Sequence, residues 1–230
     1  MAIEDIKTTA KSTRDSLQNG IYCVINPLVR LFIKMGVTPN MVTTIGLFGQ
    51  IAGAAFMVWA GYLASKGENP FSVFTWGGII IILFSVFDML DGQVARLGNM
   101  ITRFGAMYDS VLDRYCEMFT LGGVAFYLIQ CGDLLGAIIT FLGLIGSLMV
   151  SYVRARAEGL NIECKMGFMQ RPERVVVATV GIIATGITGL CAPTFNPNII
   201  LVVAMAIIAV FANITAFARI NHCRKAMLEK

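Results

Sequence analysis

Four aspartates stand in two closely spaced pairs near the middle of the chain. Asp88 and Asp91 are three positions apart, and Asp109 and Asp113 are four positions apart. On a helix, either spacing places both side chains of a pair on one face. The Gly-Asn step at 98–99 favours a turn between the pairs. Two antiparallel helices joined by this turn would bring the four carboxylates together.

Clustered carboxylates repel one another, and they are costlier still beside hydrocarbon. A bound divalent cation resolves both problems. Ligands that are all oxygen suit Mg²⁺ or Mn²⁺, and four acids leave room for two ions. The only histidine, His222, lies near the C-terminus, which excludes a Ser-His-Asp triad and argues against a zinc site with histidine ligands. A salt-bridged turn with solvated acids is the simpler alternative.

The composition places this acid group in a membrane protein. Of 230 residues, 57% are hydrophobic and 14% are charged, whereas soluble domains have about 45–50% apolar and about 25% charged residues. This excludes a disordered chain and an ordinary soluble enzyme. The six cysteines form no CxxC pair, so neither a zinc site nor a redox motif is indicated. A net charge of +4 is too small to indicate nucleic acid as a partner.

The predicted fold class is all-α, a polytopic bundle of six transmembrane helices preceded by an N-terminal interfacial amphipathic helix. Each span needs roughly 20 apolar residues. The six predicted spans are Val42–Ala64, Phe74–Asp91, Gly105–Gln130, Leu134–Val153, Val175–Leu190 and Ile199–Phe217. They form a single domain, in which 1–37 is the cytoplasmic or interfacial segment, 38–220 the six-helix bundle and 221–230 a cytoplasmic tail.

The basic residues predict the orientation of these spans. Of the 18 lysines and arginines, all but Lys66 fall on one side of the predicted topology. The positive-inside rule then places both termini and the acid pairs on the cytoplasmic side. The segment Ile21–Met35 has apolar residues interrupted by Pro27, Arg30 and Lys34, so it lies along the membrane surface or packs on the bundle as an entry helix.

Eight positions around the acids carry a resemblance to a known family. The chain fits D-x2-D-G-x2-A-R-x8-G-x3-D-x3-D throughout, and this pattern resembles the signature of the CDP-alcohol phosphotransferases. The six-span layout with an interfacial helix is also similar to that family. The fixed positions are Asp88, Asp91, Gly92, Ala95, Arg96, Gly105, Asp109 and Asp113.

The resemblance implies that an alcohol attacks the lipid-side phosphorus of a CDP-linked lipid and that CMP leaves. Asp88, Asp91 and Asp109 would hold two Mg²⁺ together with Asp113, and Asp113 would also be the general base. The family also implies a homodimer in the cell (inner) membrane, surrounded by membrane lipids. The residues that would contact the CDP-lipid are Pro39, Asn40, Met41, Val42, Gly92, Arg96 and Thr102.

Basic residues gather a second time, between the fourth and fifth predicted spans. Five basic residues there are typical of orientation and anionic headgroup contact. Arginine forks also suit a phosphate on the acceptor, which a neutral acceptor would not need. Pro172 marks a first helical turn beside them. The residues of this predicted acceptor-phosphate site are Ser151, Arg154, Arg156, Arg171 and Arg174.

The strings "SYVRARAE" and "RPER" are similar to the prokaryotic phosphatidylinositol phosphate synthases of that family. In those enzymes the position of Arg154 is often lysine. The resemblance implies that CDP-diacylglycerol and myo-inositol phosphate give phosphatidylinositol phosphate and CMP. The arginines argue against free inositol or serine as acceptor, but they do not distinguish inositol phosphate from glycerol phosphate, the acceptor of phosphatidylglycerophosphate synthase. A non-enzymatic cation-binding membrane protein is the alternative from another class.

Three further polar residues have open interpretations. Glu117 lies one turn beyond Asp113 and is either functional or the partner of an arginine. Asn213 is expected to take part in helix packing, and Gly136, Gly143 and Gly146 are expected to allow helices to approach closely. Arg219, at the end of the last span, is interpreted as an interface anchor that is able to reach the acceptor site.

Overall fold

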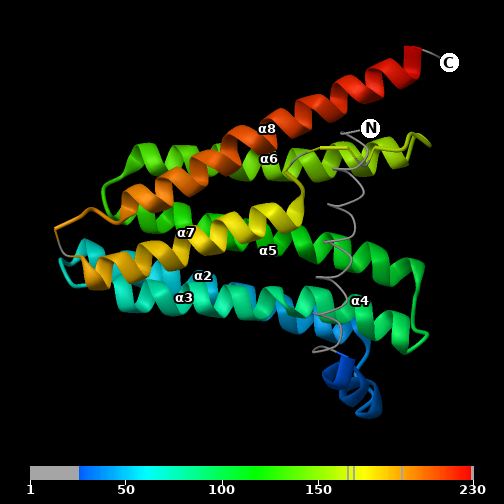
Figure 1. The fold of residues 1–230 in the computed structure, drawn as a ribbon, viewed down its shortest axis with the longest axis horizontal. Coiled ribbons are helices and arrows are strands. Elements are labelled where there is room, and N and C mark those ends of the chain that lie inside the picture. The colour runs from blue at the N-terminus through cyan, green and yellow to red at the C-terminus, as the bar shows by residue number, and fades with distance from the viewer. Residues whose placement is uncertain (1–25, 165, 168, 193, 229–230) are drawn as a thin grey trace, which may run out of the picture. The chain divides into compact units, whose positions relative to one another are not determined.

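A computed structural model describes residues 26–164, 166–167, 169–192 and 194–228, and the regular structure in these ranges is helical throughout. Residues 26–34 form the first described helical segment; the predicted interfacial residues 21–25 lie outside the described part. The remaining helices, labelled in Figure 1, are α2 (Pro39–Ser65), α3 (Phe71–Ser85), α4 (Phe87–Leu97), α5 (Arg103–Gln130), α6 (Leu134–Glu158), α7 (Arg171–Cys191) and α8 (Asn198–Leu228).

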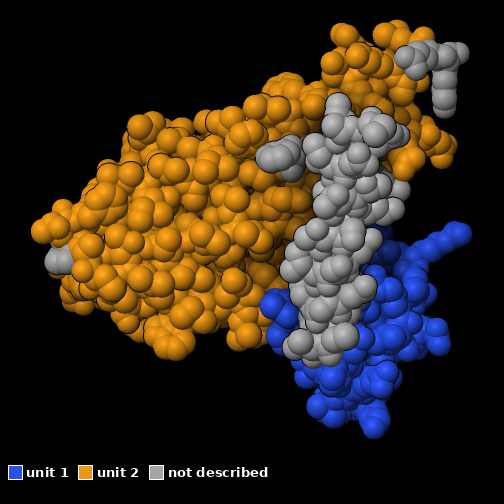
Figure 2. Space-filling view, in the orientation of Figure 1, with its two compact units in different colours: residues 1–46, 86–110 blue, residues 47–85, 111–230 orange. Residues whose placement is uncertain are grey.

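The chain divides into two compact units, coloured separately in Figure 2. Unit 1 comprises residues 1–46 and 86–110, and unit 2 comprises residues 47–85 and 111–230. Unit 1 therefore contains the start of α2, all of α4 and the start of α5. Unit 2 contains the remainder of these two long helices together with α3, α6, α7 and α8.

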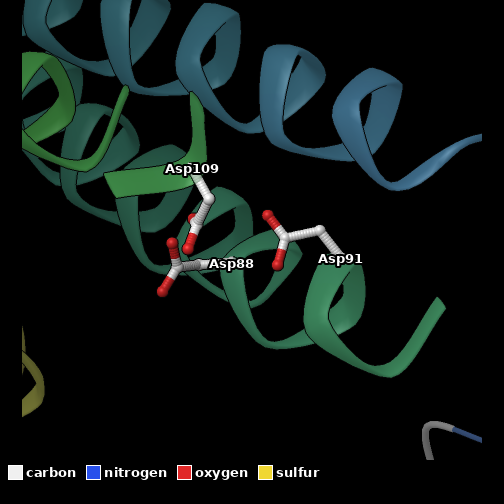
Figure 3. Close-up of side chains that lie close together, drawn as sticks. All are labelled: Asp88, Asp91 and Asp109. Carbon is white, nitrogen blue, oxygen red and sulfur yellow. The ribbon is translucent and has the colours of Figure 1, made fainter. Parts of the chain in front are cut away.

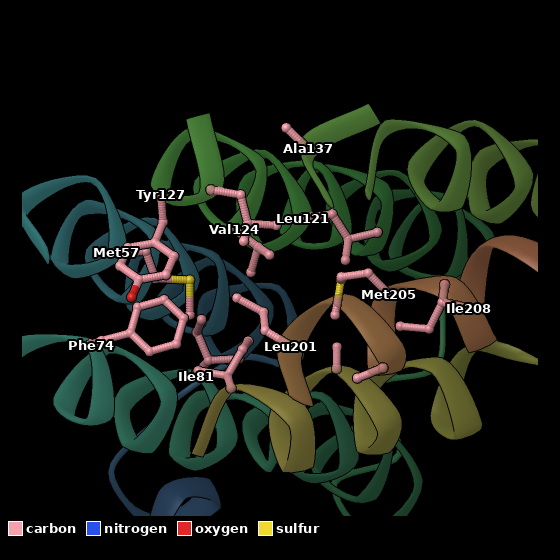
Figure 4. Packing of buried hydrophobic residues seen from close by; sticks show 14 of the residues in the cluster. Met57, Phe74, Ile81, Leu121, Val124, Tyr127, Ala137, Leu201, Met205 and Ile208 are labelled. Carbon is pink, nitrogen blue, oxygen red and sulfur yellow. The ribbon is translucent and has the colours of Figure 1, made fainter. Parts of the chain in front are cut away.

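The core of unit 2 is apolar and is built by helices distant in the sequence. Phe74 of α3 and Tyr127 of α5 are fully buried, and their ring centroids lie 4.2 Å apart. Met205 of α8 and Ile182 of α7 belong to the same cluster (Figure 4). The Tyr127 hydroxyl donates to Asn198 Oδ1 over 3.1 Å, so the polar tip of this buried ring has a partner.

Many large apolar side chains are exposed on unit 2. Large side chains such as Trp76, Val180 and Phe217 are more than half exposed, a pattern that fits lipid rather than water as the surrounding solvent. Within the described residues, five stretches are long and apolar enough to cross a membrane. They are Pro39–Ser65, Phe71–Leu97, Leu134–Glu158, Arg171–Cys191 and Asn198–Leu228. The chain is a multi-pass membrane protein.

Small residues allow α6 and α8 to pack closely. A Cβ at Gly146 would lie 2.6 Å from Asn213 Nδ2, and one at Gly136 would lie 2.7 Å from Val202. Asn213 of α8 donates to the Leu142 carbonyl of α6 over 3.0 Å. The predicted packing roles of Asn213 and of these glycines are confirmed, since small residues and interhelical hydrogen bonds hold membrane helices together.

Unit 1 has its own small core. Val29, in the helical segment 26–34, packs with Val42 of α2 and with Leu90 and Val94 of α4, and all four are buried. The spacing of Leu90 and Val94 puts both on one face of α4. This core fixes α4 against the start of α2.

The predicted turn between the acid pairs is confirmed. α4 ends at Leu97, and Asn99 adopts a φ of 52°, in the left-handed region that asparagine tolerates. Gly98 has an ordinary φ of −86°, but a Cβ there would lie 2.7 Å from the Val94 carbonyl. Crowding, rather than backbone freedom, accounts for this glycine.

Two helices extend beyond the predicted ends of their membrane spans. The second span was predicted to end at Asp91, but helix continues to Leu97, with a short interruption at Val86. Slightly more than one turn before this interruption, the Ile81 carbonyl accepts side-chain hydrogen bonds from Gln50 and Ser85. At the other end of the chain, α8 continues without a break through 221–228, the described part of the predicted tail.

Candidate active site

Three of the four predicted acids converge in unit 1. Asp88 and Asp91 project from α4, and Asp109 projects from the second turn of α5 (Figure 3). One carboxylate oxygen from each lies within 4.8 Å of the others. Asp91 is 5% exposed, and Asp88 and Asp109 are partly buried. Three oxygen donors at this separation fit a hard divalent cation such as Mg²⁺ or Mn²⁺.

The first turns of α2 are bonded to both acid-bearing helices. The Thr43 hydroxyl donates to Asp91 Oδ2 over 2.6 Å. The next residue, Thr44, shares a hydrogen bond of 3.0 Å with the hydroxyl of Tyr108, immediately before Asp109. Sequence reasoning did not single out either threonine, because hydroxyl residues in membrane helices usually bond only to the carbonyl four residues earlier.

The predicted CDP-lipid residues occupy the same unit. Pro39 is the first residue of α2, and Thr102 caps α5 by accepting a hydrogen bond of 2.9 Å from the Gly105 N–H. A Cβ at Gly105 would lie 3.0 Å from Thr102 Oγ1 and 3.3 Å from Asn40 Oδ1. Gly105 therefore lets the start of α2 and the start of α5 approach closely.

The other predicted CDP-lipid residues differ in exposure. Met41 is 50% exposed, whereas Val42 is fully buried and belongs to the small core. Arg96 is exposed on the last turn of α4. A Cβ at Gly92 would lie 3.6 Å from one terminal nitrogen of Arg96, so the arginine folds back over this glycine.

The fourth predicted acid, Asp113, lies on the part of α5 that belongs to unit 2. Its Oδ1 is 2.8 Å from a terminal nitrogen of Arg171, and its Oδ2 is 4.0 Å from Arg114. The Asp113 side chain is 14% exposed and that of Arg171 is 24% exposed. Arg171 is the first residue of α7, where Pro172 occupies the first helical turn as predicted.

A second, more deeply buried ion pair joins the same two helices one turn further on. Arg174 donates to both carboxylate oxygens of Glu117, over 2.6 and 3.2 Å, and also to the Met169 carbonyl over 3.1 Å. The two side chains are 2% and 7% exposed. Glu117, whose role was open, is thus the partner of an arginine on another helix.

The other predicted acceptor residues lie at the cytoplasmic-side end of α6 in the predicted topology. Ser151 is partly buried, and Arg154 and Arg156 are exposed. Arg154 pairs with Glu158 over 2.9 Å on the same helix. An exposed pair of this kind is weak, so it leaves Arg154 available to an anionic ligand.

Arg219 is more deeply buried than the predicted role of an interface anchor would require. It is 2% exposed on α8 and donates to the Met166 and Val150 carbonyls over 2.8 and 2.6 Å. Arg154 and Arg174 are among its charged neighbours. No carboxylate in the described residues lies within ion-pair distance of it. Its place at the end of an apolar span was only a weak sign of this burial.

Known proteins share this architecture. The profile of the CDP-alcohol phosphatidyltransferases matches residues 36–216. The chain belongs to this family. Phosphatidylinositol phosphate synthase of Mycobacteroides abscessus is 31% identical over 202 residues, which cover 87% of this chain and 84% of the relative.

Two solved structures of Mycobacterium tuberculosis phosphatidylinositol phosphate synthase also match this CDP-alcohol phosphatidyltransferase. The one with CDP-DAG bound has 29% identity and a TM-score of 0.72, over 87% of this chain and 93% of its own. The one in complex with manganese and citrate has 30% identity and a TM-score of 0.72, over 86% and 88%.

Family membership makes this chain a membrane-embedded transferase of phospholipid biosynthesis. The matched range includes all four aspartates and every other predicted site residue, whereas Arg219 lies just beyond it. The resemblance that the signature indicated is therefore confirmed. The roles of the individual side chains are taken up as proposals below.

Proposed function

We propose that the protein transfers the phosphatidyl group of CDP-diacylglycerol to myo-inositol phosphate, giving phosphatidylinositol phosphate and CMP. The convergence of Asp88, Asp91 and Asp109 supports the phosphoryl-transfer part of this proposal most directly. The similarity to phosphatidylinositol phosphate synthases, one of them solved with CDP-DAG bound, supports the choice of substrates.

The proposed metal site consists of Asp88, Asp91 and Asp109, with Asp113 one turn further along α5. Its oxygen-only donors fit two Mg²⁺ ions, and Mn²⁺ would suit the same ligands. A relative solved in complex with manganese supports a divalent cation. When bound, such ions would neutralise the diphosphate and stabilise the leaving CMP. We assign CDP contacts to the backbone or side chains of Pro39–Val42, Gly92, Arg96 and Thr102.

The chain's own acid and base chemistry centres on Asp113 in this proposal. The acceptor hydroxyl oxygen forms a bond to the lipid-side phosphorus while the bond from that phosphorus to the CMP oxygen breaks, and Asp113 takes the hydroxyl proton. In-line displacement of this kind depends mainly on positioning and charge stabilisation. Arg171 lies 2.8 Å from Asp113, so a phosphate held by Arg171 would bring the acceptor hydroxyl close to the base.

The acceptor phosphate is assigned to Ser151, Arg154, Arg156, Arg171 and Arg174, and we add Arg219. The hydrogen bonds of the buried Arg219 guanidinium go to carbonyls, and among its charged neighbours Glu158 opposes Arg154 and Arg174, so its buried charge is only partly compensated, which is costly. A phosphate dianion would offset this charge and that of the neighbouring arginines. Glu117 and Met169 already accept hydrogen bonds from the Arg174 guanidinium, so its charge is compensated and its direct part in phosphate binding would be smaller.

We further propose a single domain with six spans in the inner membrane, α5 being the sixth, and with both termini and the active site cytoplasmic. α5 has 28 residues, long enough to cross, but Asp113, Arg114 and Glu117 lower its hydropathy. The buried Glu117–Arg174 pair supports its insertion, because charges inside membranes are normally paired within the bundle. The family resemblance also favours a homodimer.

The deciding experiment measures CMP release by the purified, detergent-solubilised chain with Mg²⁺ and CDP-diacylglycerol. Myo-inositol phosphate, free inositol, glycerol 3-phosphate and serine are offered one at a time. Turnover with inositol phosphate alone is expected. Turnover only with glycerol 3-phosphate would overturn the acceptor assignment and leave the transferase chemistry in place.

A further inference from the structure

The Thr43 hydroxyl makes a short hydrogen bond to Asp91, a member of the three-acid group. The hydroxyl lies 2.6 Å from Asp91 Oδ2, and both residues are buried, at 7% and 5% exposure. The Pro39 carbonyl lies 3.0 Å from the same hydroxyl. A hydroxyl has a single proton to donate, and a carboxylate at the shorter distance is the stronger acceptor.

The position of Thr43 on α2 is itself held in place. Thr44 bonds to Tyr108 of α5 over 3.0 Å, and Val42 packs in the small core with Leu90 of α4. Consecutive helical residues point about 100° apart. The side chains of Val42, Thr43 and Thr44 therefore contact the small core, the Asp91 carboxylate and α5, respectively. These contacts hold the Thr43 hydroxyl in place, so it does not move with the Asp91 side chain if that side chain rotates.

We propose that Thr43 is a positioning residue that fixes the Asp91 carboxylate for divalent-cation binding. Its hydroxyl bonds to Oδ2, and this bond sets the direction of the carboxylate that lies beside those of Asp88 and Asp109. Hydrogen bonds to the ligands of a metal orient them, and losing one typically costs about 10–100-fold in metal affinity or activity. The proposal rests on the metal site of the proposed function and adds a residue outside the aspartate signature.

The test is Mn²⁺ binding, measured by the electron paramagnetic resonance signal of free Mn²⁺, on the purified full chain without substrates. Thr43→Val keeps the branched shape and removes the donor, and we expect it to raise the Mn²⁺ Kd about tenfold or more. Thr43→Ser keeps the hydroxyl and is expected to restore binding. Thr120→Val is the matched control, since Thr120 is also buried and donates to a side chain, Gln50 Oε1, over 2.9 Å.

A second readout separates positioning from a general loss of structure. At increasing Mg²⁺, Thr43→Val is expected to need about tenfold more Mg²⁺ for half-maximal CMP release, with an unchanged KM for CDP-diacylglycerol at saturating Mg²⁺. If Thr43→Val does not yield folded protein, Thr43→Ala removes the same donor. A wild-type Kd in the folded variant, or a serine variant as weak as valine, would overturn the proposal.

The metal measurement also separates this proposal from the proposed function. Asp91→Asn serves as the reference for a lost ligand. Wild-type protein that binds Mn²⁺ through Asp91 but releases no CMP with any acceptor contradicts the proposed function and leaves the role of Thr43 standing. Normal turnover with an unchanged Kd in Thr43→Val contradicts only the role of Thr43.

Discussion

Asp113 and Arg171 form a direct ion pair, 2.8 Å between Oδ1 and a terminal guanidinium nitrogen, that joins α5 to the first turn of α7. The pair brings the proposed general base into contact with a residue of the proposed acceptor site. Both side chains remain partly exposed, at 14% and 24%. In the proposed mechanism, a phosphate bound to Arg171 would lie beside the group that takes the proton.

The first prediction concerns the base itself. Asp113→Asn keeps the size of the side chain and a carbonyl oxygen for Arg171, but an amide does not take the acceptor proton. We expect CMP release to fall by about 10²-fold to 10⁴-fold, with CDP-diacylglycerol binding retained. The apparent Tm of the variant in detergent serves as the control for folding. Undiminished turnover would remove Asp113 from the role of base.

The second prediction concerns the acceptor phosphate. Arg171→Gln removes the charge that faces both Asp113 and the proposed phosphate. Because hydrogen bonds to charged groups contribute about 1.5–3 kcal/mol, we expect the KM for inositol phosphate to rise tenfold or more, at about 1.4 kcal/mol per tenfold, while the KM for CDP-diacylglycerol stays the same.

Arg224→Gln provides the control for this measurement. Arg224 is exposed near the end of α8, so its loss lowers the net positive charge equally without touching the proposed site. A KM for the acceptor that rises equally in both variants would point to general electrostatic attraction, and the specific assignment of Arg171 would be wrong.

The third prediction compares a buried ion pair with an exposed one. Glu117→Gln leaves the buried Arg174 without its counter-charge, and breaking a buried pair in this way costs about 3–5 kcal/mol. We expect a marked fall in the apparent Tm in detergent. The double variant Glu117→Gln with Arg174→Gln is expected to recover part of the loss, because it removes the uncompensated charge.

Glu158→Gln is the exposed counterpart. It breaks the Arg154–Glu158 pair, whose side chains are 44% and 53% exposed, and such pairs contribute about 0–1 kcal/mol. Its Tm is expected to stay close to that of the wild-type protein. Equal shifts in Glu117→Gln and Glu158→Gln would contradict the structural role of the buried pair.

Local spacing was enough to predict much of the acid group. The intervals between Asp88 and Asp91 and between Asp109 and Asp113 define helix faces, and the step at 98–99 defines a turn. These features depend only on residues close together in the chain. The helix-terminal role of Pro172 was predicted for the same reason.

Such local patterns do not predict the partners of the buried charged residues. Glu117 and Arg174 are 57 residues apart, and their pairing depends on how α5 and α7 pack. The burial of Arg219 likewise depends on carbonyls of the α6 end and of the connection before α7. Thr43 was overlooked because the sequence does not distinguish a threonine bonded to its own helix from one that reaches a neighbouring carboxylate.

The last prediction tests the close packing of α6 and α8. In Gly146→Ala the new Cβ would lie 2.6 Å from Asn213 Nδ2 and 3.0 Å from its backbone nitrogen, so the helices must separate and the Asn213–Leu142 bond must stretch. Overpacking of this kind costs about 1–3 kcal/mol, and we expect a lower apparent Tm.

Gly122→Ala is the matched control for this prediction, because a Cβ at Gly122 on α5 meets nothing within 4 Å. With no clash, replacing a helical glycine is expected to leave the Tm unchanged or to raise it, since alanine is favoured over glycine in helices by up to about 1 kcal/mol. Helix propensity favours alanine at both positions, so opposite Tm shifts in the two variants would come from the difference in packing. A Gly146→Ala variant as stable as Gly122→Ala would mean that the close approach of α6 and α8 does not contribute to stability.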